Sequence, residues 1–214
     1  ARLWAAAGER ERARESAREA ADTAQRAGRP GEAADWLHLA ICQLDRRDPD
    51  YAALRRRQAD LLIASERHRE AYRALATCLR FARDDAERAG LLIRQARTLV
   101  FLSQFSKARE RAVEARRLAT LLDLPDVAGD AAIVTGMAMY RLGLLQDGLA
   151  FLTEAAAELA TLNDRRGQAE CLFLAGHCAS MLRLPEARGL LDDSLRLVEN
   201  TGEARLEVNI LLAL

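Results

Sequence analysis

The sequence predicts an all-α protein that folds as a right-handed α-solenoid of antiparallel helix pairs. Three observations support this prediction: the composition favours helices, prolines stand between the helical segments, and small residues recur at a nearly constant interval. We expect residues 1–214 to form a single repeat domain with about five complete helix pairs and the first helix of a sixth.

The composition favours helices over strands. Ala, Leu, Arg and Glu dominate the chain, and the β-branched residues that a sheet requires are few. Hydrophobic residues make up 50% of the sequence but aromatic residues only 5%, so the chain can bury a continuous core yet lacks the aromatic content of a compact enzyme. The formal net charge of zero argues against a general affinity for nucleic acid or membrane surfaces. No apolar run approaches the roughly 18 residues needed to span a bilayer.

Helical periodicity divides the chain into a short opening helix and a series of longer ones. In chain order, the predicted helices cover residues 1–8, 9–28, 31–45, 50–65, 67–83, 86–103, 105–122, 126–142, 146–162, 166–182, 185–200 and 203 onward.

Turn and capping residues separate these segments. Pro30, Pro49, Pro125 and Pro185 all stand at predicted junctions, as expected because a proline inside a helix costs about 3 kcal/mol. The apolar pattern breaks again at residues 142–144, Leu-Gly-Leu, which indicates a tight turn between two helices. Acidic residues that can cap a helix or complement its dipole stand near four helix starts, at Asp84 and Asp85, Asp126, Asp164 and Glu203.

Small residues recur in both helices of each pair with one period. The first helices carry Ala21, Ala59, Ala96, Gly136 and Gly176, and the second helices carry Ala33, Ala71, Ala108, Gly148 and Ala187. Successive members of both columns are 37 to 40 residues apart, which is typical of an α-solenoid. The predicted repeats are therefore residues 9–48, 49–85, 86–125, 126–164 and 165–202, followed by a partial repeat at 203–214.

The fourth repeat carries the pattern Gly136, Tyr140, Gly143, Gly148, Leu152 and Ala155. It resembles a tetratricopeptide repeat, which has a small residue in its first helix, another that opens its second helix, and then Leu and Ala one and two turns on. Two features of this chain differ from the usual tetratricopeptide pattern. The period here is longer, and the family's first-helix Trp, Gly and Tyr are mostly replaced, as by Gln58, Ala59 and Leu62.

The longer helices resemble the 40-residue tetratricopeptide-like arms of large bacterial regulators: STAND-type ATPases, LuxR-type activators and receptor-like Ser/Thr kinases. The opening segment, residues 3–44, is similar to the entry into such arms. This resemblance implies a protein-interaction or ligand-sensing module within a larger signalling or transcription regulator. The alternative is a purely structural assembly scaffold. Both ends of the sequence lie inside helical patterns, which we interpret as a piece of a longer polypeptide.

A binding groove is expected on the first helices, because stacked pairs curl so that these helices line a concave wall. The candidate groove residues are Arg56, Asp60, Ile93, Arg97, Phe101, Ile133, Met137, Tyr140, Arg141, Phe173, His177 and Met181. This stripe is charged in its N-terminal half and apolar in its C-terminal half, with side chains that commonly anchor helices or extended peptides. The apolar positions could equally pack between neighbouring repeats, and the sequence leaves both interpretations open.

The expected partner is a protein or peptide, and a small-molecule effector is left open. Nucleic acid is not expected, because the basic run Arg55–Arg57 lies near Asp50 and Asp60 and no aromatic residues interleave with it. The last segment offers a further contact through an apolar face made of Val208, Ile210, Leu211, Leu212 and Leu214. We expect residues 203–214 either to associate, symmetrically with a second copy or by docking into a neighbouring protein, or to remain frayed.

The sequence shows no catalytic, cofactor or metal site. No nucleophile, base and orienting residue come together, and no Gly-rich phosphate loop follows a strand. The four cysteines, Cys42, Cys78, Cys171 and Cys178, are expected to pack as small apolar residues, which suits a reducing cytoplasm. The three histidines, His38, His68 and His177, are interpreted as isolated, with no His or Cys at ligand spacing. We therefore expect a soluble, cytoplasmic protein that is not an enzyme.

Overall fold

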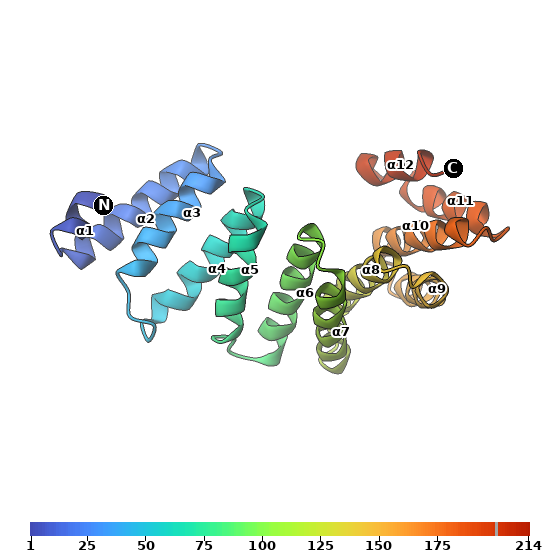
Figure 1. Ribbon diagram of the computed structural model, residues 1–214, viewed down its shortest axis with the longest axis horizontal. Coiled ribbons are helices and arrows are strands. Elements are labelled where there is room, and N and C mark those ends of the chain that lie inside the picture. The colour runs from blue at the N-terminus through green and yellow to red at the C-terminus, as the bar shows by residue number, and fades with distance from the viewer. Residues whose placement is uncertain (200) are drawn as a thin grey trace. The chain divides into compact units, whose positions relative to one another are not determined.

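The computed structural model describes residues 1–199 and 201–214. These residues form twelve α-helices and no β-strand, which confirms the predicted all-α class (Figure 1). They divide into two compact units, Ala1–Asp84 and Asp85–Leu214, and each unit contains its own helix pairs.

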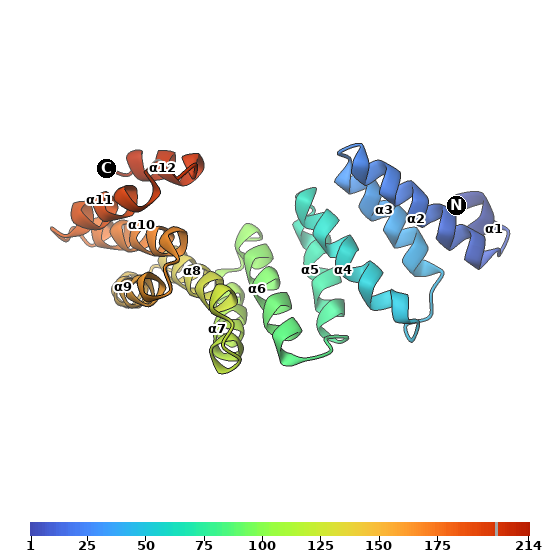
Figure 2. The same ribbon diagram turned by 180° about the vertical axis from the view of Figure 1, so that it is seen from behind.

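The first unit contains a short helix followed by two helix pairs. Its elements are α1 (Arg2–Ala6), α2 (Arg10–Arg26), α3 (Pro30–Cys42), α4 (Pro49–Ala64) and α5 (His68–Leu79). Helices α2 and α3 lie side by side in both views (Figure 1, Figure 2), and α4 and α5 form the next pair. Helix α3 also packs against α4, so the two pairs are joined.

The second unit contains three helix pairs and one further helix. Its elements are α6 (Asp85–Phe101), α7 (Phe105–Leu121), α8 (Pro125–Arg141), α9 (Leu145–Thr161), α10 (Arg165–Met181), α11 (Ala187–Val198) and α12 (Ala204–Leu211). Within this unit α8 packs against both α6 and α10, so the first helices of successive pairs are neighbours. Helix α12 contacts α11.

Local sequence signals explain where several helices begin. Pro30, Pro49 and Pro125 occupy the first turn of α3, α4 and α8, where a missing N–H leaves no intrahelical hydrogen bond unmade. Asp164 caps α10, because its Oδ1 accepts a hydrogen bond from the backbone N–H of Gly167 at 2.8 Å. The predicted helix junctions at these positions are therefore confirmed.

Several helices are shorter than the sequence predicts, and α5 differs most. The predicted helix 67–83 is α5, which ends at Leu79; beyond it Phe81 packs its ring against Tyr51 of α4, with ring centroids 5.4 Å apart. The predicted helix 185–200 is α11, which begins at Ala187 because Pro185 lies in a turn. Its predicted end at residue 200 lies outside the described residues. The other predicted ends that the structure describes shift by at most three residues.

The two columns of small residues lie at helix contacts. All their members are buried except Ala187, which is half-buried. A Cβ atom added to Gly136 would overlap the side chain of Leu152, and one added to Gly176 would lie 2.7 Å from Leu191 Cδ2. The small residue of the first helix therefore makes room for a leucine of the second helix.

The turn inside each pair uses one backbone conformation. The residue at the centre of the turn has a positive φ angle in all five pairs: Gly28, Glu66, Ser103, Gly143 and Arg183. These residues are also 37 to 40 positions apart, so the repeat extends to the turns. Glycine adopts this left-handed conformation without a steric penalty, whereas Glu66, Ser103 and Arg183 do not share that freedom.

Candidate functional site

The structure places the predicted groove residues in both units. Arg56 and Asp60 lie on α4 in the first unit, and the other candidates lie on α6, α8 and α10 in the second. Arg56 is half-buried, and its Nη2 donates a hydrogen bond to the carbonyl oxygen of Phe81 at 3.5 Å. Asp60 is exposed. Arg56 therefore helps to hold the segment that follows α5.

One row of candidates packs between neighbouring helices. Ile93 on α6 and Ile133 on α8 are buried, and Ile133 belongs to a core cluster with Leu152. Arg97 is exposed on α6 and forms an ion pair with Asp130 on α8. In this row the ion pair of Arg97 with Asp130 joins α6 to α8, and the two isoleucines are buried.

A second row forms an aromatic cluster on α8 and α10. The rings of Phe173 and His177 meet edge to face with centroids 4.5 Å apart, and the Tyr140 ring lies 5.7 Å from His177. Met137, Tyr140 and Phe173 are half-buried and pack against the core of this unit. Burial lowers the pKa of His177, because desolvation disfavours the charged imidazolium. The cluster is therefore an apolar, largely uncharged surface.

Three candidates are exposed at the ends of the first helices. Phe101, Arg141 and Met181 are the last residues of α6, α8 and α10, so they occupy equivalent positions in three repeats. Phe101 is 67% exposed and Met181 is 64% exposed. The guanidinium carbon of Arg141 lies 4.9 Å from the centre of the Phe105 ring. These side chains therefore present apolar and cationic surface at the C-terminal ends of the helices.

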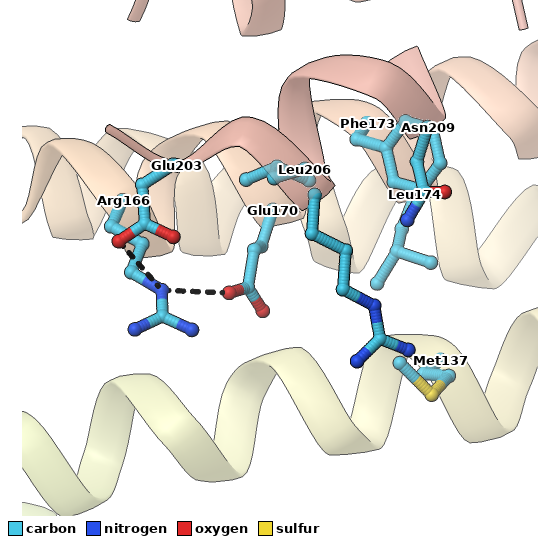
Figure 3. A pocket seen from close by; sticks show the side chains of 9 residues that line it. Met137, Arg166, Glu170, Phe173, Leu174, Glu203, Leu206 and Asn209 are labelled. Carbon is cyan, nitrogen blue, oxygen red and sulfur yellow. Dashed lines mark hydrogen bonds and ion pairs between the residues drawn. The ribbon is translucent and has the colours of Figure 1, made fainter. Parts of the chain in front are cut away.

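A cavity of about 330 Å³ opens between α8, α10 and α12 (Figure 3). Met137 and Phe173 line it, so the structure brings these two candidates to one site. The other lining residues are Arg166, Glu170, Leu174, Glu203, Arg205, Leu206 and Asn209. Figure 3 shows the aromatic ring of Phe173 at one end and the ionised side chains of Arg166 and Glu203 at the other. The cavity therefore has an apolar end and a charged end.

Arg166 organises the charged end of the cavity. Its Nε lies 3.1 Å from Glu170 Oε1 and 3.7 Å from Glu203 Oε1, so it joins α10 to the start of α12. Attraction to Glu170 is the largest cause that raises the pKa of this guanidinium. Arg205 also lines the cavity, but within the described part of the chain it forms no ion pair.

The sequence pattern identifies only two of the nine residues that line the cavity. The predicted stripe follows the first helices of the complete pairs and passes beside Arg166 and Glu170 without including them. A signal for these two was present, because they are four residues apart, the spacing of an ion pair on a helix surface. The contributions of Leu206 and Asn209 depend on how α12 packs, which no local pattern reveals.

The two cysteines of this unit, Cys171 and Cys178, are buried. Among the described residues, no three His, Cys, Asp or Glu side chains gather in one group. Burial raises the pKa of Cys171 to about 12 and also raises the pKa of Cys178, so neither is a reactive thiolate. None of the described helices is long and apolar enough to cross a membrane.

The sequence matches no protein-family model and no curated protein, but it is similar in structure to solved proteins. A putative kinesin light chain from Podosopora anserina with tetratricopeptide-like repeats is 16% identical, with a TM-score of 0.69 over 88% of this chain and 96% of that one. The tetratricopeptide protein YrrB, which has an unusual peptide-binding site, is 18% identical, with a TM-score of 0.63 over 90% of this chain and 87% of that one.

A larger protein is also similar. A STAND ATPase with a tetratricopeptide repeat sensor, from Pyrococcus horikoshii, is 14% identical, with a TM-score of 0.66 over 94% of this chain and 35% of that one. This chain thus spans about a third of the STAND protein. At such low identities the likeness shows the fold alone, which is that of a tetratricopeptide-like helical solenoid. The predicted fold class is confirmed.

Proposed function

We propose that this chain is a non-catalytic interaction module that binds a segment of a partner protein in the cavity between α8, α10 and α12. The observation that carries the proposal is the composition of the cavity wall. Met137, Phe173 and Leu206 contribute apolar side chains to this wall, and Arg166, Glu170, Glu203 and Arg205 contribute charged ones. Protein-binding surfaces combine an apolar anchor pocket with a polar rim in the same way.

The cavity suits one large side chain of a peptide. Its volume of about 330 Å³ is at the small end of the range for ligand pockets. A side chain that enters it removes water from the half-buried carbon atoms of Met137 and Phe173, which contributes about 25 cal/mol for each Å² of apolar surface. Asn209 and Arg205 are exposed beside it and can hydrogen-bond to the carbonyl groups of an extended peptide. A small-molecule effector could use the same features.

The similar structures support the proposal at a coarser level. One of them has a peptide-binding site, and another carries its tetratricopeptide repeats as a sensor. We extend the proposal to a sensing arm of a larger cytoplasmic signalling or transcription regulator. In that setting, occupancy of the cavity biases a catalytic or DNA-binding domain elsewhere in the polypeptide.

Peptide selection with matched variants tests this function. Peptides selected from a displayed random-sequence library against the wild-type protein should give saturable binding in isothermal titration calorimetry. Met137→Gln and Leu206→Gln each replace an apolar side chain of the cavity wall by a polar amide and should weaken binding about tenfold or more, which is about 1.4 kcal/mol. Leu162→Gln changes an exposed leucine outside the cavity and should bind as the wild type does.

Circular dichroism of all three variants separates loss of binding from loss of fold. Equal affinities for Met137→Gln and Leu162→Gln would show that the selected peptides bind elsewhere. A large drop in the unfolding temperature of Met137→Gln would show that this side chain belongs to the core and not to an open binding surface.

A structural scaffold is the second candidate, and ion pairs between neighbouring repeats favour it. Arg97 on α6 pairs with Asp130 on α8, and Arg116 on α7 pairs with Glu158 on α9. Such pairs, added to the shared core, stiffen the stack of helices in this unit. If the protein is a scaffold, no selected peptide should lose affinity when Met137 is replaced. In a pull-down with defined components, a scaffold should instead bind two different proteins at the same time.

A further inference from the structure

The first unit holds a histidine and a cysteine that lie together on α3. His38 and Cys42 are four residues apart, so they project from the same helix face. The distance from Cys42 Sγ to His38 Nε2 is 3.7 Å, and both side chains are exposed. The sequence-based interpretation of His38 as isolated, and of Cys42 as a packed apolar residue, is therefore wrong. The other three cysteines are buried.

The separation of the two donor atoms matches a metal chelate. Zinc binds thiolate sulfur at about 2.3 Å and imidazole nitrogen at about 2.0–2.1 Å, in tetrahedral geometry. Two such bonds at an angle of about 109° place the sulfur and nitrogen atoms about 3.5 Å apart. The observed separation of 3.7 Å therefore requires only a small torsional adjustment to admit the ion.

The surroundings of the pair carry charges of both signs. Cys42 is the last residue of α3, where carbonyl groups without helical partners carry partial negative charge. His38 and Cys42 line a cavity of about 580 Å³ together with Arg2, Glu32, Asp35, Trp36 and Leu39. The Arg2 guanidinium is held over the Trp36 ring, 5.2 Å from its centroid. The carboxylates of Asp35 and Glu32 do not complete a metal site, because each forms an ion pair with an arginine. Arg67 Nη1 lies 2.7 Å from Asp35 Oδ1, and Arg29 Nη1 lies 2.6 Å from Glu32 Oε2.

We propose that His38 and Cys42 form a two-ligand site for Zn²⁺, whose other coordination positions face the cavity and take water or a small solute. Thiolate and imidazole are the donors that zinc prefers, whereas Mg²⁺ and Ca²⁺ prefer oxygen. As the Zn–S bond forms, the thiol of Cys42 releases its proton to solvent, and the neutral imidazole donates its Nε2 lone pair. Because the chain supplies only two ligands, the ion remains open to exchange and to added ligands.

Cobalt(II) is a suitable probe, because it replaces zinc and its thiolate complexes absorb in the near ultraviolet. Titration of the reduced protein with Co²⁺ should give a saturable charge-transfer absorption that added Zn²⁺ removes. Cys42→Ser should abolish this absorption, and His38→Asn should raise the Co²⁺ concentration needed for half-saturation at least tenfold. His68→Asn, a histidine outside the pair, is the matched control and should titrate as the wild type does.

A second measurement uses the exposure of the thiol. Alkylation of Cys42 by iodoacetamide should be at least tenfold slower with saturating Zn²⁺, and chelation of the metal should restore the rate. Since both side chains are exposed, the variants should keep the circular dichroism of the wild type. The proposal is overturned if Co²⁺ gives no saturable absorption, if the absorption survives Cys42→Ser, or if Zn²⁺ leaves the alkylation rate unchanged.

Discussion

At the residue scale, glycines in the first helices set how closely the two helices of a pair approach. Gly136→Ala should lower the free energy of unfolding by about 1–3 kcal/mol, because the added Cβ would overlap Leu152. Gly189→Ala is the matched control: it lies within α11, and a Cβ added there meets no atom within 4 Å. This control should raise the stability by up to about 1 kcal/mol, since alanine is the better helix former.

Urea unfolding followed by circular dichroism measures both glycine variants. If Gly136→Ala were as stable as Gly189→Ala, the two helices would not meet at this glycine, and the assigned repeat register would be wrong. Unfolding curves with different slopes would instead indicate a change in the amount of surface exposed on unfolding.

His177 gives a second prediction at this scale. Its pKa in the folded protein lies below the ordinary value of 6.5, because burial among Tyr140 and Phe173 desolvates the ring. Below about pH 6.5 the unfolded chain therefore binds more protons than the folded one. The stability should be unaffected by this group above pH 6.5 and should fall as the pH drops from there through the lower folded pKa.

The comparison of wild type with His177→Gln isolates that contribution. The variant cannot take up the proton, so its stability should fall less steeply than that of the wild type between pH 6.5 and 5, measured as the urea midpoint at each pH. Identical pH profiles would show that the imidazole is as well solvated in the folded protein as in the unfolded one.

Some features of single residues follow from the sequence and others do not. The first-helix column that contains Ala21, Ala96 and Gly136 is predictable, because two helices that approach closely need a small residue at the point of contact. Whether each candidate groove residue is buried or exposed cannot be predicted from the sequence. Ile133 is buried and Met181 is exposed, although both belong to the same predicted stripe. Burial at those positions depends on the neighbouring repeat, which the local pattern does not contain.

At the scale of elements, the turn inside each helix pair places its central residue at a positive φ angle. In two of the five turns this residue is glycine, which adopts that angle without steric cost. Arg183→Gly should raise the free energy of unfolding by about 0.5–1 kcal/mol. A residue with a side chain at positive φ costs about 1–2 kcal/mol, which the glycine removes. Part of this gain is lost, because glycine has more conformational freedom than arginine in the unfolded chain. Gly143→Ala should have the opposite sign, because it introduces the same strain in the fourth pair.

A helical position provides the control for the turn prediction. Arg188→Gly changes an exposed arginine on α11 and should destabilise the protein by about 1 kcal/mol, since glycine disfavours helix. Thermal unfolding of the three variants should therefore rank Arg183→Gly above the wild type and the other two below it. A destabilised Arg183→Gly would mean that the arginine side chain makes a contact worth more than the backbone strain.

The elements themselves are predictable because start and stop signals are local. Pro125 opens α8 and Asp164 caps α10, and both signals act through the nearest turn of the helix. The error at α5 arises where a distant contact competes, because Phe81 packs on Tyr51 instead of extending the helix. The segment after Glu203 forms the predicted helix, and that helix contributes a wall of the cavity. That cavity could not be predicted, because its walls come from three helices, α8, α10 and α12, that are not all consecutive in the chain.

At the scale of the whole molecule, the last helix presents exposed apolar surface. Val208, Leu211 and Leu212 are 53%, 54% and 82% exposed, and their spacing places them on one face of the segment. Ile210 on the same helix is fully buried in a cluster with Leu191 and Val198. Helix α12 is therefore anchored by one side while another side remains in contact with water.

We predict that the protein self-associates through this exposed face of α12. Burial of one large apolar side chain is worth roughly 1.5–3 kcal/mol, and in a symmetric dimer each copy would cover the same side chains of the other. Sedimentation velocity over a range of protein concentrations should show a reversible dimer. The double variant Val208→Gln/Leu212→Gln should be monomeric and as helical as the wild type. Leu121→Gln changes a leucine on α7 that is 71% exposed, and this control should still dimerise. A wild type that stays monomeric at all concentrations would show that the exposed leucines of α12 do not drive association.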